Sequence, residues 1–128
     1  MKHVKIWAPA ALLSAGCMAL AAPAGACETT VGMVMELTGP AGQYGQAGAK
    51  SVEMAFRDLN EAGGVNGCDL VADTRDSQSQ GNVAVDQARQ LVNIKDVPVI
   101  IGGIISSVSI PILTSVTAPS KVVQVSPA

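Results

Sequence analysis

The stretch TVGMVMELTGPAGQYGQAGAKS, residues 30–51, sets a run of apolar residues directly before a glycine-rich turn. Its first part, residues 30–37, predicts a strand that is buried on both faces, as strands of helix-covered parallel sheets are. After the turn, apolar side chains recur at helical spacing and predict a helix that ends at Ala62-Gly63-Gly64. Its apolar stripe is expected to be Val52, Ala55, Phe56 and Leu59, with Phe56 in the core.

The alternation of strand and helix continues to the end of the chain. Further strands are expected at 68–74, 97–102 and 121–125, and a second helix should bury Ala84, Ala88, Leu91 and Val92. A short third helix is expected over 110–118, with Ser109 as its cap, Pro111 in its first turn and Pro119 at its end. The order β-α-β-α-β-α-β with short connections predicts an α/β fold, a parallel sheet with helices on both faces.

Composition limits the class of protein. The 128 residues leave room for one domain, and a net charge of -2 with 2% aromatic residues argues against a nucleic-acid partner. The one histidine lies at position 3, so the chain from residue 27 on contains none. A Ser-His-Asp triad, a Cys-His pair or a histidine-bearing metal site cannot form without histidine. We therefore expect neither a cofactor nor an enzymatic activity.

Residues 1–26 have the pattern of a secretory signal peptide. A positively charged start precedes an apolar run, and Ala24-Gly25-Ala26 fits a signal-peptidase site. The mature chain, residues 27–128, is then expected in an oxidising compartment, the periplasm. LSAGC at 13–17 and AGAC at 24–27 also resemble lipoprotein processing sites, so a lipid-anchored form is an alternative.

Two cysteines, Cys27 and Cys68, remain after the signal peptide. Cys27 precedes the first predicted strand and Cys68 precedes the second. If these strands are neighbours in a parallel sheet, both cysteines lie at the same amino-terminal edge, and we expect a disulfide between them. A lipidated Cys27 or two free thiols are the alternatives.

Ligands of parallel α/β sheets bind at the carboxyl ends of the strands, where the loops to the helices gather. Four segments qualify here: 38–46, 75–81, 103–109 and the residues from Ser126 onward. Ser106, Ser107 and Ser109 precede a helix, where hydroxyls and backbone N–H groups suit a carboxylate; ordinary capping is the alternative. Tyr44 is expected in the first loop. Its side chain is expected either to form a wall of the binding site for a small ligand or to pack over its own loop.

The turn over residues 39–48 also resembles a phosphate-binding loop, although its details differ. A Walker loop needs Gly-Lys-Ser or Gly-Lys-Thr, whereas this chain has Gly48-Ala49-Lys50-Ser51. In a dinucleotide fingerprint, Pro40 and Tyr44 would crowd the approach of a pyrophosphate to the glycines. A nucleotide-dependent enzyme is therefore kept only as the alternative function.

Acidic residues follow the first two strands. Asp73 is expected to end the second strand and Asp76 to lie in a solvated loop, rather than to form a pair for acid–base chemistry. Glu36 lies at the end of the first strand, beside the expected ligand cleft, and remains a candidate site residue.

The chain resembles the substrate-binding proteins of branched-chain amino acid ABC transporters. The likeness covers residues 29–128 and rests on ELTGPAGQYGQ, AFRDLNEAGGVNG, RDSQSQGNVAVDQARQLV, VIIGGIISSVSIP and VSPA, in that order. It implies the type I periplasmic-binding-protein fold, of which this chain is similar to the first part of lobe one. It also implies a receptor that closes two lobes on an amino acid or small amide and delivers it to an ABC permease in the membrane.

The resemblance implies roles for individual residues. Tyr44 in GQYG matches the tyrosine that lines the cleft, Ser106 in IISSVS, with Ser107 beside it, matches the serine that binds the ligand's carboxylate, and Ala128 in VSPA matches a main-chain contact. Further ligand-binding residues of the family fall beyond Ala128, so a truncated fragment without independent activity is another alternative. Some members of the family have a disulfide between the positions that Ser79 and Ile105 occupy in this chain. The expected Cys27–Cys68 disulfide is therefore not the disulfide of those members.

Overall fold

The computed structural model describes residues 27–128, and the signal peptide expected over residues 1–26 lies outside the described residues. The elements are β1 (Cys27–Met35), α1 (Gly42–Glu61), β2 (Cys68–Asp76), α2 (Gly81–Asn93), β3 (Val99–Gly102), α3 (Ser106–Ile112), the π-helical η1 (Leu113–Thr117), α4 (Ala118–Ser120) and β4 (Val123–Val125). Because α3, η1 and α4 follow one another without a break, the predicted order β-α-β-α-β-α-β is confirmed. No helix within residues 27–128 is long and apolar enough to cross a membrane.

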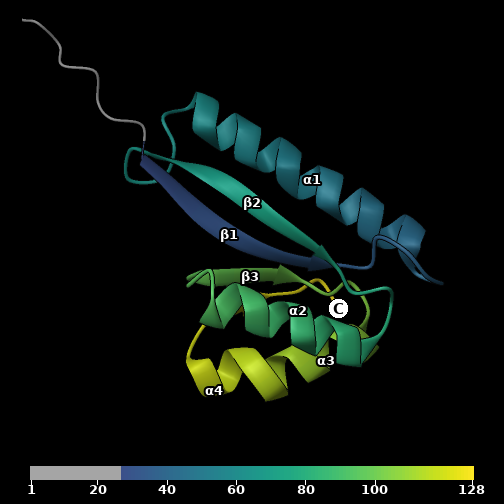
Figure 1. Cartoon of the computed structure of the whole chain (residues 1–128). Helices are drawn as coiled ribbons and strands as arrows, with labels where there is room; N and C mark the ends of the chain where they lie inside the picture. Colours follow the sequence, from purple (N-terminus) through teal and green to yellow (C-terminus); the bar gives the residue numbers. More distant parts are fainter. Residues whose placement is uncertain (1–26) are drawn as a thin grey trace, which may run out of the picture.

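The four strands form one parallel sheet in the order β2-β1-β3-β4. Figure 1 shows α1 on one face of this sheet and α2, α3 and α4 on the other. Each βαβ crossover leads to another parallel strand of the same sheet, and the crossover from β2 to β3 passes over β1, which is why the helices cover the faces. The predicted fold class is therefore confirmed.

The strand β1 separates two apolar clusters. Met33 and Met35 pack with Ala49 of α1 on one face, whereas Val34 packs on the other face against α2 and α3. Successive side chains of a strand point to opposite faces, so a strand between two helix layers is apolar throughout. The predicted stripe of α2 is confirmed, because Ala84, Ala88, Leu91 and Val92 are all buried.

The expected apolar stripe of α1 is only partly correct. Val52 and Phe56 are half-buried, while Ala55 and Leu59 are exposed. The buried residues of α1 are Gly42, Gly45 and Ala49, all nearer its start. Phe56 instead lines an open cavity of about 600 Å³ between α1 and β2. The reason is the position of β2 at the sheet edge, where the second half of α1 has no further strand to cover.

Strand boundaries differ from the predicted ones by up to three residues. β1 begins at Cys27 rather than residue 30, and β2 continues to Asp76 rather than ending at residue 74. Polar residues occupy these extra positions. They still belong to the strands because β1 and β2 pair without interruption, from Cys27 opposite Cys68 to Met35 opposite Asp76. Apolar runs mark the buried part of a strand, not the whole hydrogen-bonded ladder.

The prediction of the third helix is wrong at both ends. The helix begins at Ser106 with Ile105 in the cap position, so Pro111 lies inside it and Ser109 is a buried helical residue. Pro119 does not end the helical segment, since it lies within α4 at a position where proline is tolerated. The turn that ends α4 is made by Lys121, whose φ of 57° is left-handed.

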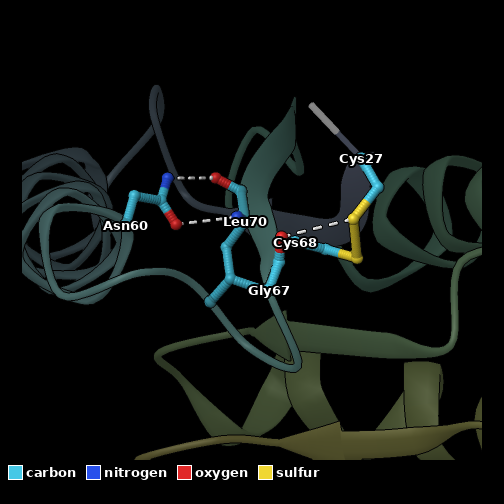
Figure 2. Close-up of a disulfide and its surroundings, with 5 residues drawn as sticks. All are labelled: Cys27, Asn60, Gly67, Cys68 and Leu70. Carbon is cyan, nitrogen blue, oxygen red and sulfur yellow. Dashed lines mark hydrogen bonds between the residues drawn. A yellow bond between two sulfur atoms is a disulfide. The ribbon is translucent and has the colours of Figure 1, made fainter. Parts of the chain in front are cut away.

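The amino-terminal edge of the sheet is fixed by a disulfide. Cys27 and Cys68 are paired in the β1–β2 register, and Figure 2 shows their sulfur atoms joined. On the outer edge of β2, the side-chain amide of Asn60 donates to the carbonyl oxygen of Leu70 and accepts from its N–H (Figure 2). Asn60 thus takes the place of a neighbouring strand at that point and protects the edge.

Loss of the disulfide should destabilise the fold. For a sequence separation of 41 between the two cysteines, the chain-entropy estimate gives a loss of about 3 to 4 kcal/mol in the free energy of unfolding. Urea unfolding of residues 27–128 with and without reductant measures this loss. The Cys27→Ser, Cys68→Ser double variant is the control and should not respond to reductant. Native, unreduced protein in which both thiols react with an alkylating agent would contradict the bridge.

Candidate functional site

The carboxyl edge of the sheet contains a topological switch point. From β1 the chain goes to β2 on one side, and from β2 it returns to β3 on the other side of β1. The arrowheads of the strands point to this edge in Figure 1. The loops after β1 and β3 therefore diverge to opposite faces, and in such sheets this is where ligands bind.

Two predicted site residues, Ser106 and Ser107, form the start of α3 on the β3 side of this point. Both are exposed, and the N–H groups of a first helical turn have no acceptor within their own helix. The two following N–H groups, of Val108 and Ser109, donate to the carbonyl oxygen of Ile105 at 2.9 and 3.0 Å. Hydroxyls and first-turn N–H groups at the sheet edge are chemically suited to a carboxylate.

The loop that carries these serines is bound to the end of β1 by Glu36. This side chain is fully buried. The N–H of Ile104 donates to both of its carboxylate oxygens at 3.1 Å, and the N–H of Ile105 donates to Oε1 at 3.3 Å. Glu36 therefore lies inside the wall of the site and not on its surface.

A second carboxylate, Asp76, joins the loops after β1 and β2. It accepts hydrogen bonds from the N–H of Leu37 at 3.0 Å, from the hydroxyl of Thr38 at 2.7 Å and from the N–H of Gln78 at 2.8 Å. Burial raises the pKa of Asp76, but the hydrogen bonds from Thr38, Gln78 and Leu37 together lower it below its ordinary value. The expectation of a solvated loop residue was wrong, because Asp76 is the last residue of β2 and is half-buried.

Tyr44 does not lie in a loop as expected. The helix α1 begins at Gly42, so Tyr44 belongs to its first turn, with 69% of its surface exposed. The side chain does not pack over its own loop to any large extent. It stands on the β1 side of the switch point, at the start of one helix, while the two serines stand on the β3 side at the start of another.

The glycines of the turn over residues 39–48 approach the protein's own backbone and side chains. Gly39 has a left-handed φ of 83° and makes the turn out of β1. Gly45 lies so close to the backbone of Glu36 that a Cβ there would overlap it, and a Cβ on Gly48 would lie 2.8 Å from Cδ1 of Ile104. These glycines therefore allow α1 to pack on the end of β1.

Ala128 lies beside the end of β4, away from Tyr44 in sequence but at the same sheet edge. Its N–H donates to the hydroxyl of Ser126 at 3.2 Å, and that hydroxyl donates to the carbonyl oxygen of Gly103 at 2.6 Å. Ala128 and Ser126 line a cavity of about 270 Å³ together with Ser109, Ile110, Leu113 and Gln124. Tyr44, Ser106 and Ser107 do not line this cavity.

Sequence reasoning missed several residues that hold the loops of this edge. Ser79 accepts from the N–H of Ala41 and donates to the carbonyl oxygen of Thr38. Gln124 donates to the carbonyl oxygens of Gly102 and Ser109, both at 3.1 Å. Their signal in the sequence is only a polar residue at or just after a strand, which many solvent-exposed positions share.

Comparison with known proteins gives a consistent result. Residues 28–128 match the family model of periplasmic binding proteins. The Leu/Ile/Val/Thr-binding protein of Salmonella typhimurium is 36% identical over 101 residues, which are 77% of this chain and 27% of that protein. The chain spans less than a third of the length of the curated relatives it matches.

Solved structures are similar over the same region. The branched-chain amino acid transporter substrate binding protein LivJ of Streptococcus pneumoniae, in complex with isoleucine, matches with a TM-score of 0.75 and 24% identity. That match covers 79% of this chain and 29% of the other. A type 1 periplasmic binding protein of Bordetella pertussis matches with a TM-score of 0.69 and 28% identity, over 76% and 26% of the two chains.

Two glycines of α1 should respond differently to alanine. In Gly45→Ala the new Cβ meets the backbone of Glu36, which cannot rotate away, so we expect a loss of about 1 to 3 kcal/mol in unfolding free energy. In Gly48→Ala it meets the end of the Ile104 side chain, and the gain of about 1 kcal/mol in helix propensity offsets the contact. Urea unfolding compares the two, and equal effects would contradict the packing described.

Asp76→Asn should destabilise the protein in a pH-dependent way. The folded pKa of Asp76 is lowered, so its stabilising effect is present above the unfolded pKa of about 4 and is lost as pH falls through the folded value. We expect a loss of about 1 to 2 kcal/mol at pH 7 that shrinks toward pH 3. Asp73→Asn, which removes only the ion pair with Arg75, is the control with a smaller cost. A pH-independent difference for Asp76→Asn would overturn this assignment.

Proposed function

The chain belongs to the periplasmic binding protein family, and from this premise we propose that it is the ligand-binding part of an ABC importer for amino acids or related small amides. The observation that carries the proposal is the start of α3 at the switch point, with Ser106 and Ser107 exposed. The Salmonella typhimurium relative, a Leu/Ile/Val/Thr-binding protein, and the isoleucine complex of the Streptococcus pneumoniae protein support the class of ligand.

In this proposal the ligand's carboxylate is held at the start of α3. Ser106 and Ser107 supply hydroxyls and N–H groups, and the positive end of the peptide dipoles favours the negative charge. Tyr44 covers the ligand from the start of α1, and the main chain at Ala128 contacts its charged groups. Closure of a second lobe over the ligand would exclude water.

The proposal assigns no catalytic role to the site. A serine nucleophile needs a base within hydrogen-bond reach, and the chain from residue 27 on has no histidine. Glu36 and Asp76, the carboxylates at this edge, accept backbone N–H groups instead. The packing of Gly45 and Gly48 against the protein itself argues against the alternative of a nucleotide at the glycine-rich turn.

We place the mature protein in the periplasm, with an ABC permease in the membrane as its partner. The family description and the signal-peptide pattern support this location. The disulfide favours a soluble form over a protein lipidated at Cys27, because lipid attachment would use the same sulfur atom.

A fragment without activity of its own is the second candidate. The chain spans less than a third of its relatives, and β4 is an edge strand in which Val123 and Val125 are more than half exposed. Exposed apolar edge strands promote association between chains. Light scattering that shows aggregation of residues 27–128 in isolation would support this candidate.

Calorimetry on a form of the protein extended by a second lobe tests the proposed function. Titration with amino acids, amides and urea should give heat with at least one of them, and Ser106→Ala should weaken that binding about tenfold or more, since it removes a hydrogen bond to a charged group. Ser115→Ala, an exposed serine elsewhere in the same helical segment, is the matched control. The absence of heat with every ligand would reject the amino-acid class, and normal binding by Ser106→Ala would reject the site.

A further inference from the structure

Glu36 is the one charged side chain that is fully buried within residues 27–128. No Lys or Arg of these residues pairs with it, and its three hydrogen bonds all come from backbone N–H groups. A buried carboxylate is costly unless hydrogen bonds satisfy it, and removing its partners or the carboxylate itself leaves polar groups unpaired. The chain therefore keeps Glu36 at a position where an apolar residue would otherwise be expected.

The N–H groups that donate to Glu36 lie at the beginning of a continuous segment, residues 104–107. The first two, of Ile104 and Ile105, donate to Glu36. The next two belong to Ser106 and Ser107, which are exposed at the start of α3. The same short segment thus gives two N–H groups to an internal carboxylate before it reaches the residues assigned to the ligand's carboxylate.

Close packing holds Glu36 on both sides. A Cβ on Gly103 would lie 2.8 Å from Oε1 of Glu36, so the loop can approach the carboxylate only because residue 103 is glycine. Gly45 of α1 lies against the backbone of Glu36 from the other side of the strand end. The position of Glu36 is therefore set by β1 and α1, and the loop after β3 follows it.

We propose that Glu36 is the positioning residue of the ligand's carboxylate site. By accepting the N–H groups of Ile104 and Ile105 it fixes the loop after β3 and restricts the ligand's carboxylate to Ser106 and Ser107. The internal carboxylate also occupies the two N–H groups that would otherwise compete for that anion. This inference rests on the proposed function, since a positioning role needs a bound ligand.

Amide hydrogen exchange in residues 27–128 tests the clamp without any ligand. In Glu36→Ala the amides of Ile104 and Ile105 should exchange at least about tenfold faster, relative to core amides of α2 in the same variant. Val34→Ala removes a buried side chain two residues earlier on β1 and is the control for general destabilisation. Acetate should restore protection in Glu36→Ala because it replaces the lost carboxylate, whereas acetamide, of similar size but uncharged, should not. Unchanged exchange, or equal rescue by acetamide, would overturn the proposal.

Affinity for the amino acid, measured by calorimetry on the form of the protein extended by a second lobe, tests the consequence for binding. Glu36→Ala should lower the affinity about tenfold or more, and Glu36→Gln less, because glutamine keeps the volume and one acceptor oxygen. Val34→Ala should bind as the wild type does. If the wild type binds and Glu36→Ala binds equally well, the positioning role is rejected. If the wild type binds no amino acid, the proposed function fails and with it the positioning role, while the exchange result still decides whether Glu36 clamps the loop.

Discussion

The structure depends on the position of the second half of β1, which is buried over residues 31–35 and pairs with β2 on one edge and with β3 on the other. Its Met33 and Met35 pack in the cluster on the α1 side, and its Val34 packs in the cluster on the side of α2 and α3. Gly32 shows how tight this packing is, since a Cβ there would lie 3.1 Å from side chains of Leu91 and Val97. Because β1 is central, its carboxyl end is also the point where the loops to α1 and α3 separate. The candidate site is a consequence of this strand order.

The loops at that end are held by carboxylates that accept backbone N–H groups. Irregular segments leave N–H groups without the partners that helices and strands provide, and these groups need acceptors when water is excluded. Asp76 supplies them for the loops after β1 and β2, and Glu36 for the loop after β3. Both residues could be mistaken for catalytic acids in the sequence, yet their oxygens accept hydrogen bonds from the protein's own backbone and, in Asp76, also from the hydroxyl of Thr38.

The spacing of apolar residues in the sequence predicted the elements whose burial depends on their own pattern alone. The buried residues of α2 were predicted correctly because the helix packs with one face against the rest of the protein, so the helical spacing of its apolar residues identifies them. The start of α1 and the start of α3 were not, since glycine and serine are typical of loops and only tertiary contacts show that they begin helices here. Phe56 and Asp76 were misjudged for a related reason: their burial depends on where β2 lies in the sheet, which local pattern does not contain.

This construction separates two tasks within the site. In the proposed function, backbone N–H groups and serine hydroxyls at the start of α3 would bind a carboxylate, a group that every amino acid has, and so they could not distinguish one amino acid from another. Discrimination requires side chains that contact the variable part of the ligand. Among the predicted site residues, only Tyr44 has a large side chain, and it is mostly exposed at the start of α1. The loop after β3 would therefore set where the carboxylate of the ligand lies. Among the predicted site residues, Tyr44 would be the one whose side chain contacts the variable part of the ligand and so influences which ligand binds.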